Sequence, residues 1–513
     1  MRLRWLGFVL LLVTSSPGLA AWHEAKSKHF VIYSEQSPEE LHEYAIKLEK
    51  FDRAVRQVRR MQDPPLGLAN RLTVYVLRDA EAVARMAGAS GSGIAGFYSP
   101  RASGSIAFVF RTKPKGPNAK AELTPDIVFF HEYLHHLMLG DTSAALPHWI
   151  VEGFAEFFST ASFEQDGSIV LGSPANHRAY GLFYFDDLSL QEMLGSSYQR
   201  LTDTERETVY GRGWLLTHYL NFEPTREGQL ARYLGGIQRG EKALDSARAA
   251  FGDLKQLNRE LNKYLRSKTL RVVKIAPAAL AIDSISVRTM SAAETAMMPV
   301  RMRSDRGVNK RSAATIASDA RRIAERFPND PFVQATLAEA EHDAGNYVAA
   351  IAAADRALAA DPAYVSALVY EGRARMRLAL SEPAKADWKA IRGWFTKANR
   401  IDPENPEPLL LFYETFAAAG SRPTANAVAG LLYAQLLVPQ DGTLRMLAVR
   451  QLLTDNRLAE AKVALTPLAY NPHGSDEREF TVAAMDAIAA GNSTAALAAL
   501  DQTSEKAKAK KDN

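Results

Sequence analysis

His131, Glu132 and His135 are spaced as H-E-x-x-H and are the residues with the clearest potential for chemistry. Residues four apart on a helix project from one face, so the two histidine rings can reach the same metal ion. The glutamate beside the first histidine is placed to take a proton from a metal-bound water. The spacing therefore predicts a hydrolytic metal centre on a helix.

The surrounding residues predict the helix that this centre requires. Thr124 suits the N-cap, Pro125 the first helical position, and Asp126 the first turn, where a carboxylate favours the helix dipole. The apolar run 127–130 follows and indicates a buried helix, and Gly140 indicates its end. His131 and His135 are thus expected well inside a helix.

A second helix is expected downstream, beginning near Pro147 and carrying Glu152 and Glu156 one turn apart. Sixteen residues separate His135 from Glu152, enough for a helix end, a loop and a returning helix. Gly153 has no side chain and would allow the two helices to approach closely. A catalytic zinc needs a third protein ligand, which a glutamate on this helix could supply.

The H-E-x-x-H motif, the spacer and the W-x-x-E-G-x-A-E string at 149–156 resemble the gluzincins, zinc metallopeptidases with two histidines and a glutamate on zinc. The string is similar to a helix of the aminopeptidase N superfamily and of bacterial peptidase-MA-like domains. The resemblance implies that His131, His135 and Glu152 bind Zn²⁺ and that Glu132 is the general base. The sequence lacks a G-x-M-E-N signature, so aminopeptidase specificity is not implied.

Other residues could contribute to the site. Glu156 is the rival of Glu152 as third ligand, or a carboxylate that orients a ligand histidine. His136 points away from the face of His131 and His135, and is expected to be structural or exposed.

An oxyanion-stabilising donor is expected from the helix predicted over 210–220. Tyr210 is the preferred catalytic candidate, with His218 and Tyr219 as alternatives. The competing interpretation is that these side chains are aromatic core residues.

The segment 21–265 is expected to form an α+β zincin-like metallopeptidase domain. Alternating apolar residues predict strands over 29–34, 71–77 and 105–110 and a helix from 39 to about 61. In zincins a strand such as 105–110 lies at the edge of the cleft, where it can pair with an extended substrate. The glycine-rich stretch 88–104 is expected to form a loop and hairpin.

Residues 266–312 are interpreted as a connector with possible short strands at 270–275 and 283–287, followed by a polar basic stretch over 301–311. The alanine-rich segment 313–505 resembles four or so tetratricopeptide repeats.

The repeat prediction rests on segments that end at Pro362, Pro403, Pro439 and Pro472, with spacings of 41, 36 and 33 residues. The first spacing leaves room for an insertion around 381–387. The alternative is an unrelated alanine-rich helical domain. A repeat domain implies a protein partner bound on its concave face.

The first 20 residues are expected to be a signal peptide, with Arg2 and Arg4 before a short apolar run and small residues before Ala21. The run is too short to predict a stable membrane span after cleavage. The chain has no cysteine. These features favour a bacterial periplasmic or secreted protein. The net charge of +4 does not indicate a basic surface for binding nucleic acid. Residues 506–513 are expected to form a disordered tail.

Two functions follow from these observations. The first is a zinc-dependent peptidase that hydrolyses peptide bonds of exported proteins, with Glu132 activating the zinc-bound water and the repeats binding protein. The alternative is a non-catalytic, repeat-containing scaffold on a metallopeptidase fold. Glu132 favours the enzyme, because a purely structural zinc site has no use for a general base. A further enzymatic alternative takes its third ligand from a glutamate much further downstream.

Overall fold

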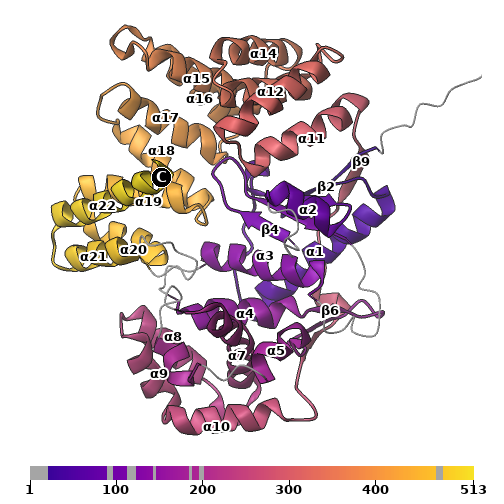
Figure 1. Ribbon diagram of the computed structural model, residues 1–513, viewed down its shortest axis with the longest axis vertical. Helices are drawn as coiled ribbons and strands as arrows, with labels where there is room; N and C mark the ends of the chain where they lie inside the picture. Colours follow the sequence, from indigo (N-terminus) through magenta and orange to yellow (C-terminus); the bar gives the residue numbers. More distant parts are fainter. Residues whose placement is uncertain are drawn as a thin grey trace, which may run out of the picture.

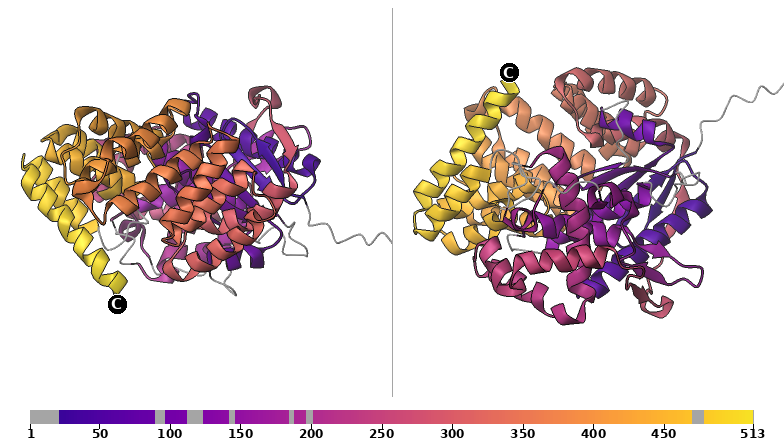
Figure 2. Two further views of the ribbon diagram at one scale, coloured as in Figure 1. Left: turned by 90° about the horizontal axis from the view of Figure 1, so that it is seen from above. Right: turned by 60° about the horizontal axis from the view of Figure 1, so that its bottom comes forward.

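The computed structural model describes residues 21–88, 96–111, 123–141, 146–183, 188–195, 201–469 and 478–512. The expected signal peptide lies outside the described residues. Figures 1 and 2 show an α+β part, drawn from indigo to magenta, beside an arc of paired helices, drawn from orange to yellow. None of the helices in the part that the structure describes has the length and apolar character needed to cross a lipid bilayer.

A 6-stranded mixed sheet forms the centre of the α+β part, in the order β4-β5-β3-β2-β1-β9. The central strands β2, β3 and β5 are parallel, and the other three are antiparallel to their neighbours. The strands are β1 (His23–Lys26), β2 (Phe30–Ser34), β3 (Leu72–Leu77), β4 (Gly96–Ser99), β5 (Ile106–Phe110) and β9 (Ser286–Thr289). The strands predicted over 29–34, 71–77 and 105–110 are confirmed as β2, β3 and β5.

The expectation that the strand over 105–110 can pair with an extended substrate is wrong. β5 is paired on both sides, with β3 and with β4. The chain enters β5 from the hairpin that the glycine-rich stretch was expected to form, and this hairpin places β4 outside it. On this side of the sheet, β4 is the edge strand among the residues that the structure describes.

One face of the sheet packs against α1 (Pro38–Arg59) and α3 (Pro125–Asp141). Alternate strand residues point to this face, among them Ile32, Val74 and Val109, all buried. The core between sheet and helices thus holds α3, the H-E-x-x-H helix, against the sheet.

The opposite face of the sheet carries a row of aromatic side chains. The Tyr75 ring lies 5.5 Å from the Tyr33 ring and 4.9 Å from the Phe108 ring, each in stacked geometry. Two helices contribute to the cluster over this row, α2 (Ala80–Ala87) and α11 (Ala292–Arg306), the latter through Met298 and Met302. A helix that begins almost two hundred residues after β5 thus completes the packing of the sheet.

Truncation tests this dependence. A chain that ends at Met290 keeps all 6 strands but exposes the aromatic row, where each buried aromatic side chain covers about 150–250 Å². We expect it to aggregate, whereas a chain that ends at Ala469 and keeps α11 stays soluble. Size-exclusion chromatography and circular dichroism measure both outcomes. A monomeric, folded chain ending at Met290 would show that the sheet does not need α11.

The expected connector over 266–312 is wrong in its C-terminal half. β8 (Val273–Ile275) and β9 are short strands near the predicted positions, but 292–306 and 310–324 form helices α11 and α12. Ser291 and Glu294 form a capping box that starts α11, so the basic residues that suggested a connector lie on a helix.

Among the remaining elements of the α+β part, α4 packs against α3, and α7 packs against α4. A 3-stranded antiparallel sheet has the order β6-β7-β8. The elements are α4 (His148–Ser159), β6 (Ser162–Phe163), β7 (Ile169–Leu171), α5 (Ala179–Phe183), α6 (Leu190–Gly195), α7 (Asp203–Phe222), α8 (Gln229–Gln238), α9 (Ala243–Phe251) and α10 (Leu254–Leu265).

Paired helices continue to the C-terminus, and the helical repeats that the sequence predicts are present. Pro362, Pro403 and Pro439 lie between successive pairs, and Pro472 lies outside the described residues. The expected insertion around 381–387 contains a short 3-10 turn between α15 and α16. The helices are α12 (Lys310–Ala324), α13 (Pro331–Asp343), α14 (Tyr347–Ala360), α15 (Val365–Ala379), α16 (Trp388–Ile401), α17 (Pro406–Ala418), α18 (Ala425–Leu437), α19 (Gly442–Thr454), α20 (Leu458–Ala469), α21 (Arg478–Ala489) and α22 (Ser493–Asp512).

α22 runs to Asp512, into the segment 506–513 that is expected to form a disordered tail. Alanine, lysine and glutamate are good helix formers, so this composition can extend a helix.

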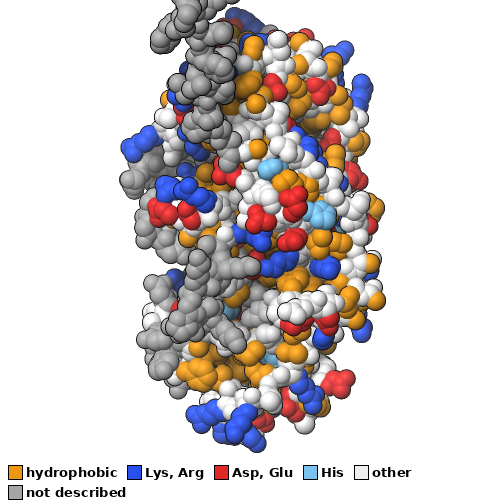
Figure 3. All heavy atoms as spheres, turned by 90° about the vertical axis from the view of Figure 1, so that its right-hand side faces the viewer, with side chains coloured by type: hydrophobic (Ala, Val, Ile, Leu, Met, Phe, Trp, Pro, Cys, Tyr) orange, Lys and Arg blue, Asp and Glu red, His pale blue; other side chains and the backbone are white. Residues whose placement is uncertain are grey.

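Basic and acidic side chains are interspersed over the face of the molecule that Figure 3 shows.

Candidate metal centre

α3 presents the two histidines as the sequence predicts. The Thr124 hydroxyl accepts a hydrogen bond from the Ile127 backbone N–H at 3.2 Å, as an N-cap residue does. His131 and His135 follow one turn apart, with 9% and 6% of their surface exposed. Glu132 lies between them, is half-buried, and belongs to the same helix.

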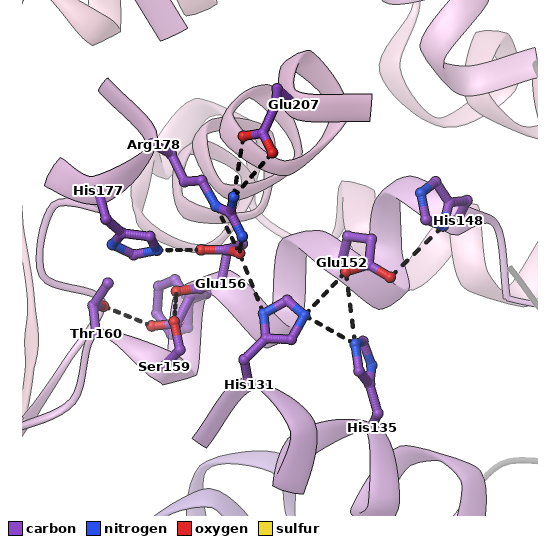
Figure 4. A network of polar contacts seen from close by, with 11 residues as sticks. His131, His135, His148, Glu152, Glu156, Ser159, Thr160, His177, Arg178 and Glu207 are labelled. Atoms are coloured by element: carbon purple, nitrogen blue, oxygen red, sulfur yellow. Dashed lines mark hydrogen bonds and ion pairs between the residues drawn. The ribbon is translucent and has the colours of Figure 1, made fainter. Parts of the chain in front are cut away.

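α4 brings Glu152 to these histidines, where it is fully buried. The His131 and His135 Nε2 atoms lie 3.1 Å apart, and the Glu152 Oε2 atom lies 3.2 Å from the first and 3.6 Å from the second (Figure 4). Two ligands of a tetrahedral zinc are about 3.3–3.6 Å apart when each is about 2.0–2.2 Å from the ion. The three observed separations, 3.1–3.6 Å, are at or slightly below this range, so one metal ion could be held by all three atoms.

Glu156 lies behind His131 and contacts its other ring nitrogen. The Nδ1 atom is 3.2 Å from Glu156 Oε1, so the carboxylate can fix the tautomer that leaves Nε2 available to a metal. Burial opposes the charged form of His131, but the contacts with Glu152 and Glu156 outweigh it and raise its pKa to about 10. The structure thus places Glu152 against both histidines and Glu156 against His131 alone.

His177 and Arg178 hold Glu156, and nothing in the sequence pattern indicated them. His177 Nε2 lies 2.7 Å from Glu156 Oε2, and the Arg178 guanidinium donates to Oε1 at 2.7 and 3.0 Å. Burial would raise the pKa of Glu156, yet His131, His177 and Arg178 hold it well below its usual range. His177 and Arg178 lie on a short 3-10 turn without a spacing pattern, so no sequence signal relates them to the motif.

Tyr210 is the aromatic residue of α7 that lies at the centre. Its ring centroid is 5.9 Å from that of His131 and 6.4 Å from that of His148, and the Arg178 guanidinium carbon lies 4.4 Å from the centroid. His148, which the sequence left unassigned, has its Nδ1 atom 3.8 Å from Glu152 Oε1.

The alternatives to Tyr210 have structural contacts. His218 is fully buried, and its Nε2 atom lies 3.0 Å from the Arg271 carbonyl and 3.1 Å from the Gly172 carbonyl. Tyr219 donates to Glu260 at 3.1 Å. Both therefore support the packing around α7.

Close packing of α4 on α7 sets the position of Glu152. A Cβ atom at Gly153 would lie 2.4 Å from the Gly213 carbonyl oxygen and 2.6 Å from the Thr217 hydroxyl oxygen. The expectation that Gly153 admits the H-E-x-x-H helix is wrong, because the helix that approaches it is α7. The absence of a side chain at this position lets α7 pass directly beneath the glutamate.

His136 is structural, as its position on the helix predicts. Its Nδ1 atom lies 2.7 Å from the Tyr98 hydroxyl on β4, and its ring stacks on Tyr133. Burial lowers the pKa of His136 to about 4 and raises the pKa of Tyr98.

A second buried cluster on α1 also combines a histidine with carboxylates. His29 Nδ1 lies 2.7 Å from Glu49 Oε2 and 3.5 Å from Asp52 Oδ2. Asp52 accepts hydrogen bonds from the Arg56 guanidinium and, at 2.7 Å, from the Tyr133 hydroxyl on α3. This cluster is an ion-pair network, which contacts α3 through the Tyr133 hydroxyl.

Comparisons with known proteins leave the family open. No family model matches the chain, and no curated protein matches it. Among solved structures, a thermophilic TPR protein from Thermus thermophilus is similar to part of the chain at 18% identity. The match covers 37% of this chain and 97% of that one, with a TM-score of 0.31. The description of the repeats therefore rests on the helices themselves.

Proposed function

We propose that this protein is a zinc-dependent peptidase with a zincin-like catalytic domain. The observation that carries the proposal is the placement of His131 Nε2, His135 Nε2 and Glu152 Oε2 within 3.1–3.6 Å of one another. Histidine nitrogens and a carboxylate oxygen are a usual donor set for a catalytic zinc. The motif supplies a general base beside them, which a structural zinc site does not require.

Each side chain has a defined task in peptide hydrolysis. Zinc, when bound, would polarise the scissile carbonyl and make a water molecule more acidic. Glu132 accepts the proton of the attacking water and returns it to the leaving amine. Glu156 keeps the His131 ring oriented, and Tyr210 is the candidate donor to the oxyanion.

The substrates that we propose are exported proteins, on the basis of the signal peptide that the first 20 residues are expected to form. The helical repeats offer a further surface for protein binding, as stacked helix pairs commonly do. The proximity of the Tyr210 ring to the rings of His131 and His148 supports its role as the oxyanion donor.

Metal content tests the proposal directly. We expect the purified protein to hold about one zinc per chain by plasma mass spectrometry, and His135→Ala to lose it. His42→Ala, which removes an exposed histidine of α1, is the matched control and should retain the zinc. A wild-type protein without metal after growth and purification with zinc would contradict the proposal. Zinc without any peptide hydrolysis would favour the scaffold alternative.

A further inference from the structure

The edge strand β4 contacts α3 at His136, the residue next to the proposed metal ligand His135. The Tyr98 hydroxyl lies 2.7 Å from Nδ1 of His136, the residue that follows His135. The two rings meet edge to face at 5.5 Å. β4 therefore keeps a fixed distance from α3 as long as this contact holds.

The turn between β4 and β5, residues 100–105, packs against the helical repeats. Ala102 is 7% exposed and packs in a cluster with Leu431 of α18 and Leu444 of α19. Its backbone N–H donates to Asp441 Oδ2 at 2.7 Å, while Asp441 Oδ1 caps α19. In Figure 1, β4 lies next to α3, and the repeat helices α18 and α19 lie to its left.

A polar contact and a strand pairing join these two contacts. Gln440 Nε2 donates to Ser105 Oγ at 3.3 Å, and both residues are buried. Ser105 directly precedes β5, whose Ala107 pairs with Tyr98 of β4, and Tyr98 contacts His136. Residues of the α18–α19 turn are thus connected to the residue beside a metal ligand although more than 300 positions separate them in sequence.

We propose that Gln440 and Asp441 are positioning residues, through which the repeat domain holds the edge strand in register with the metal centre. This inference rests on the proposed peptidase function. An extended peptide added to an edge strand is bound by backbone hydrogen bonds, whose donor and acceptor atoms must lie about 2.7–3.2 Å apart. A small displacement of β4 therefore weakens substrate binding without removing a catalytic group.

Asp441→Asn tests the contact at nearly constant shape. The side-chain oxygen can still cap α19, but the amide N–H₂ then faces the Ala102 N–H instead of accepting from it. Asp387→Asn is the matched control, because Asp387 caps α16 through the Ala390 N–H at an exposed position. We expect faster hydrogen exchange at residues 96–110 in Asp441→Asn alone.

Steady-state kinetics distinguish a displaced edge strand from a loss of folding or of the metal centre. With an internally quenched peptide as probe, we expect Asp441→Asn to raise KM about threefold to tenfold, the cost of one hydrogen bond. The kcat should stay within about twofold, and the zinc content should be unchanged. Tyr98→Phe removes the hydroxyl that contacts His136 and should raise KM in the same way. The effect of both substitutions together on KM should be smaller than the sum of the two single effects, expressed as free energies.

The outcomes distinguish this inference from the proposed function. Unchanged hydrogen exchange and KM in Asp441→Asn would overturn the inference, as would a parallel loss of kcat, zinc and thermal stability. If the wild type binds no zinc and cleaves no peptide, the proposed function fails. In that case exchange at 96–110 still decides whether the α18–α19 turn holds the hairpin.

Discussion

Replacement of Glu132 by glutamine is expected to abolish peptide hydrolysis while zinc stays bound. Glutamine keeps the shape of the side chain but cannot accept the proton of the attacking water. Positioned acid–base groups contribute about 10²–10⁴-fold to rate, and we expect a loss of this size in kcat. Because Glu132 is not among the three grouped donors, the metal content should remain about one zinc per chain. Cleavage of fluorescein-labelled casein and plasma mass spectrometry measure the two quantities.

Glu43→Gln provides the control for this result. Glu43 is an exposed glutamate of α1, so the same chemical change there should leave hydrolysis and metal content at wild-type levels. Hydrolysis at the wild-type rate in Glu132→Gln would remove the general-base assignment. Loss of zinc from this variant would instead mean that Glu132 helps to hold the metal.

The local part of the candidate site could be predicted because helical periodicity fixes it. The spacing of His131 and His135 places both rings on one face, and the N-cap at Thr124 marks where the helix starts. Spacing alone leaves both Glu152 and Glu156 as candidates for the third ligand, and the resemblance of the string 149–156 to the gluzincins implies Glu152. The helical repeats follow from a similar periodic signal of alanine and proline.

The parts that could not be predicted depend on contacts between distant segments. The resemblance to zincins implies that the strand over 105–110 can pair with a substrate, but β4 pairs with it instead, through a hairpin whose strands the sequence does not define. The segment 292–306 is interpreted as part of a connector because the stretch 301–311, at its end and beyond, is polar and basic. Its methionines, Met298 and Met302, cover the sheet, which only the tertiary structure reveals. Arg178 and His177 reach Glu156 from a turn with no regular spacing.

Gly153→Ala is expected to destabilise the protein and to release its zinc. The added Cβ would lie 2.4 Å from the Gly213 carbonyl oxygen, a distance that forces α4 and α7 apart. Overpacking of this kind costs about 1–3 kcal/mol of unfolding free energy, and we expect the upper end because the obstacle is backbone. The displaced helix carries Glu152, so the donor atoms should no longer surround one ion.

Gly393→Ala separates this effect from the helix preference of alanine. Gly393 lies inside α16, where an added Cβ meets no atom within 4 Å. Alanine is favoured over glycine in a helix by about 1 kcal/mol, so this variant should be slightly more stable than the wild type and keep its zinc. Urea denaturation followed by circular dichroism, with metal analysis, compares the two. If Gly153→Ala matched Gly393→Ala in both measurements, α4 could move away from α7 without displacing Glu152, and the helix crossing would not set the metal geometry.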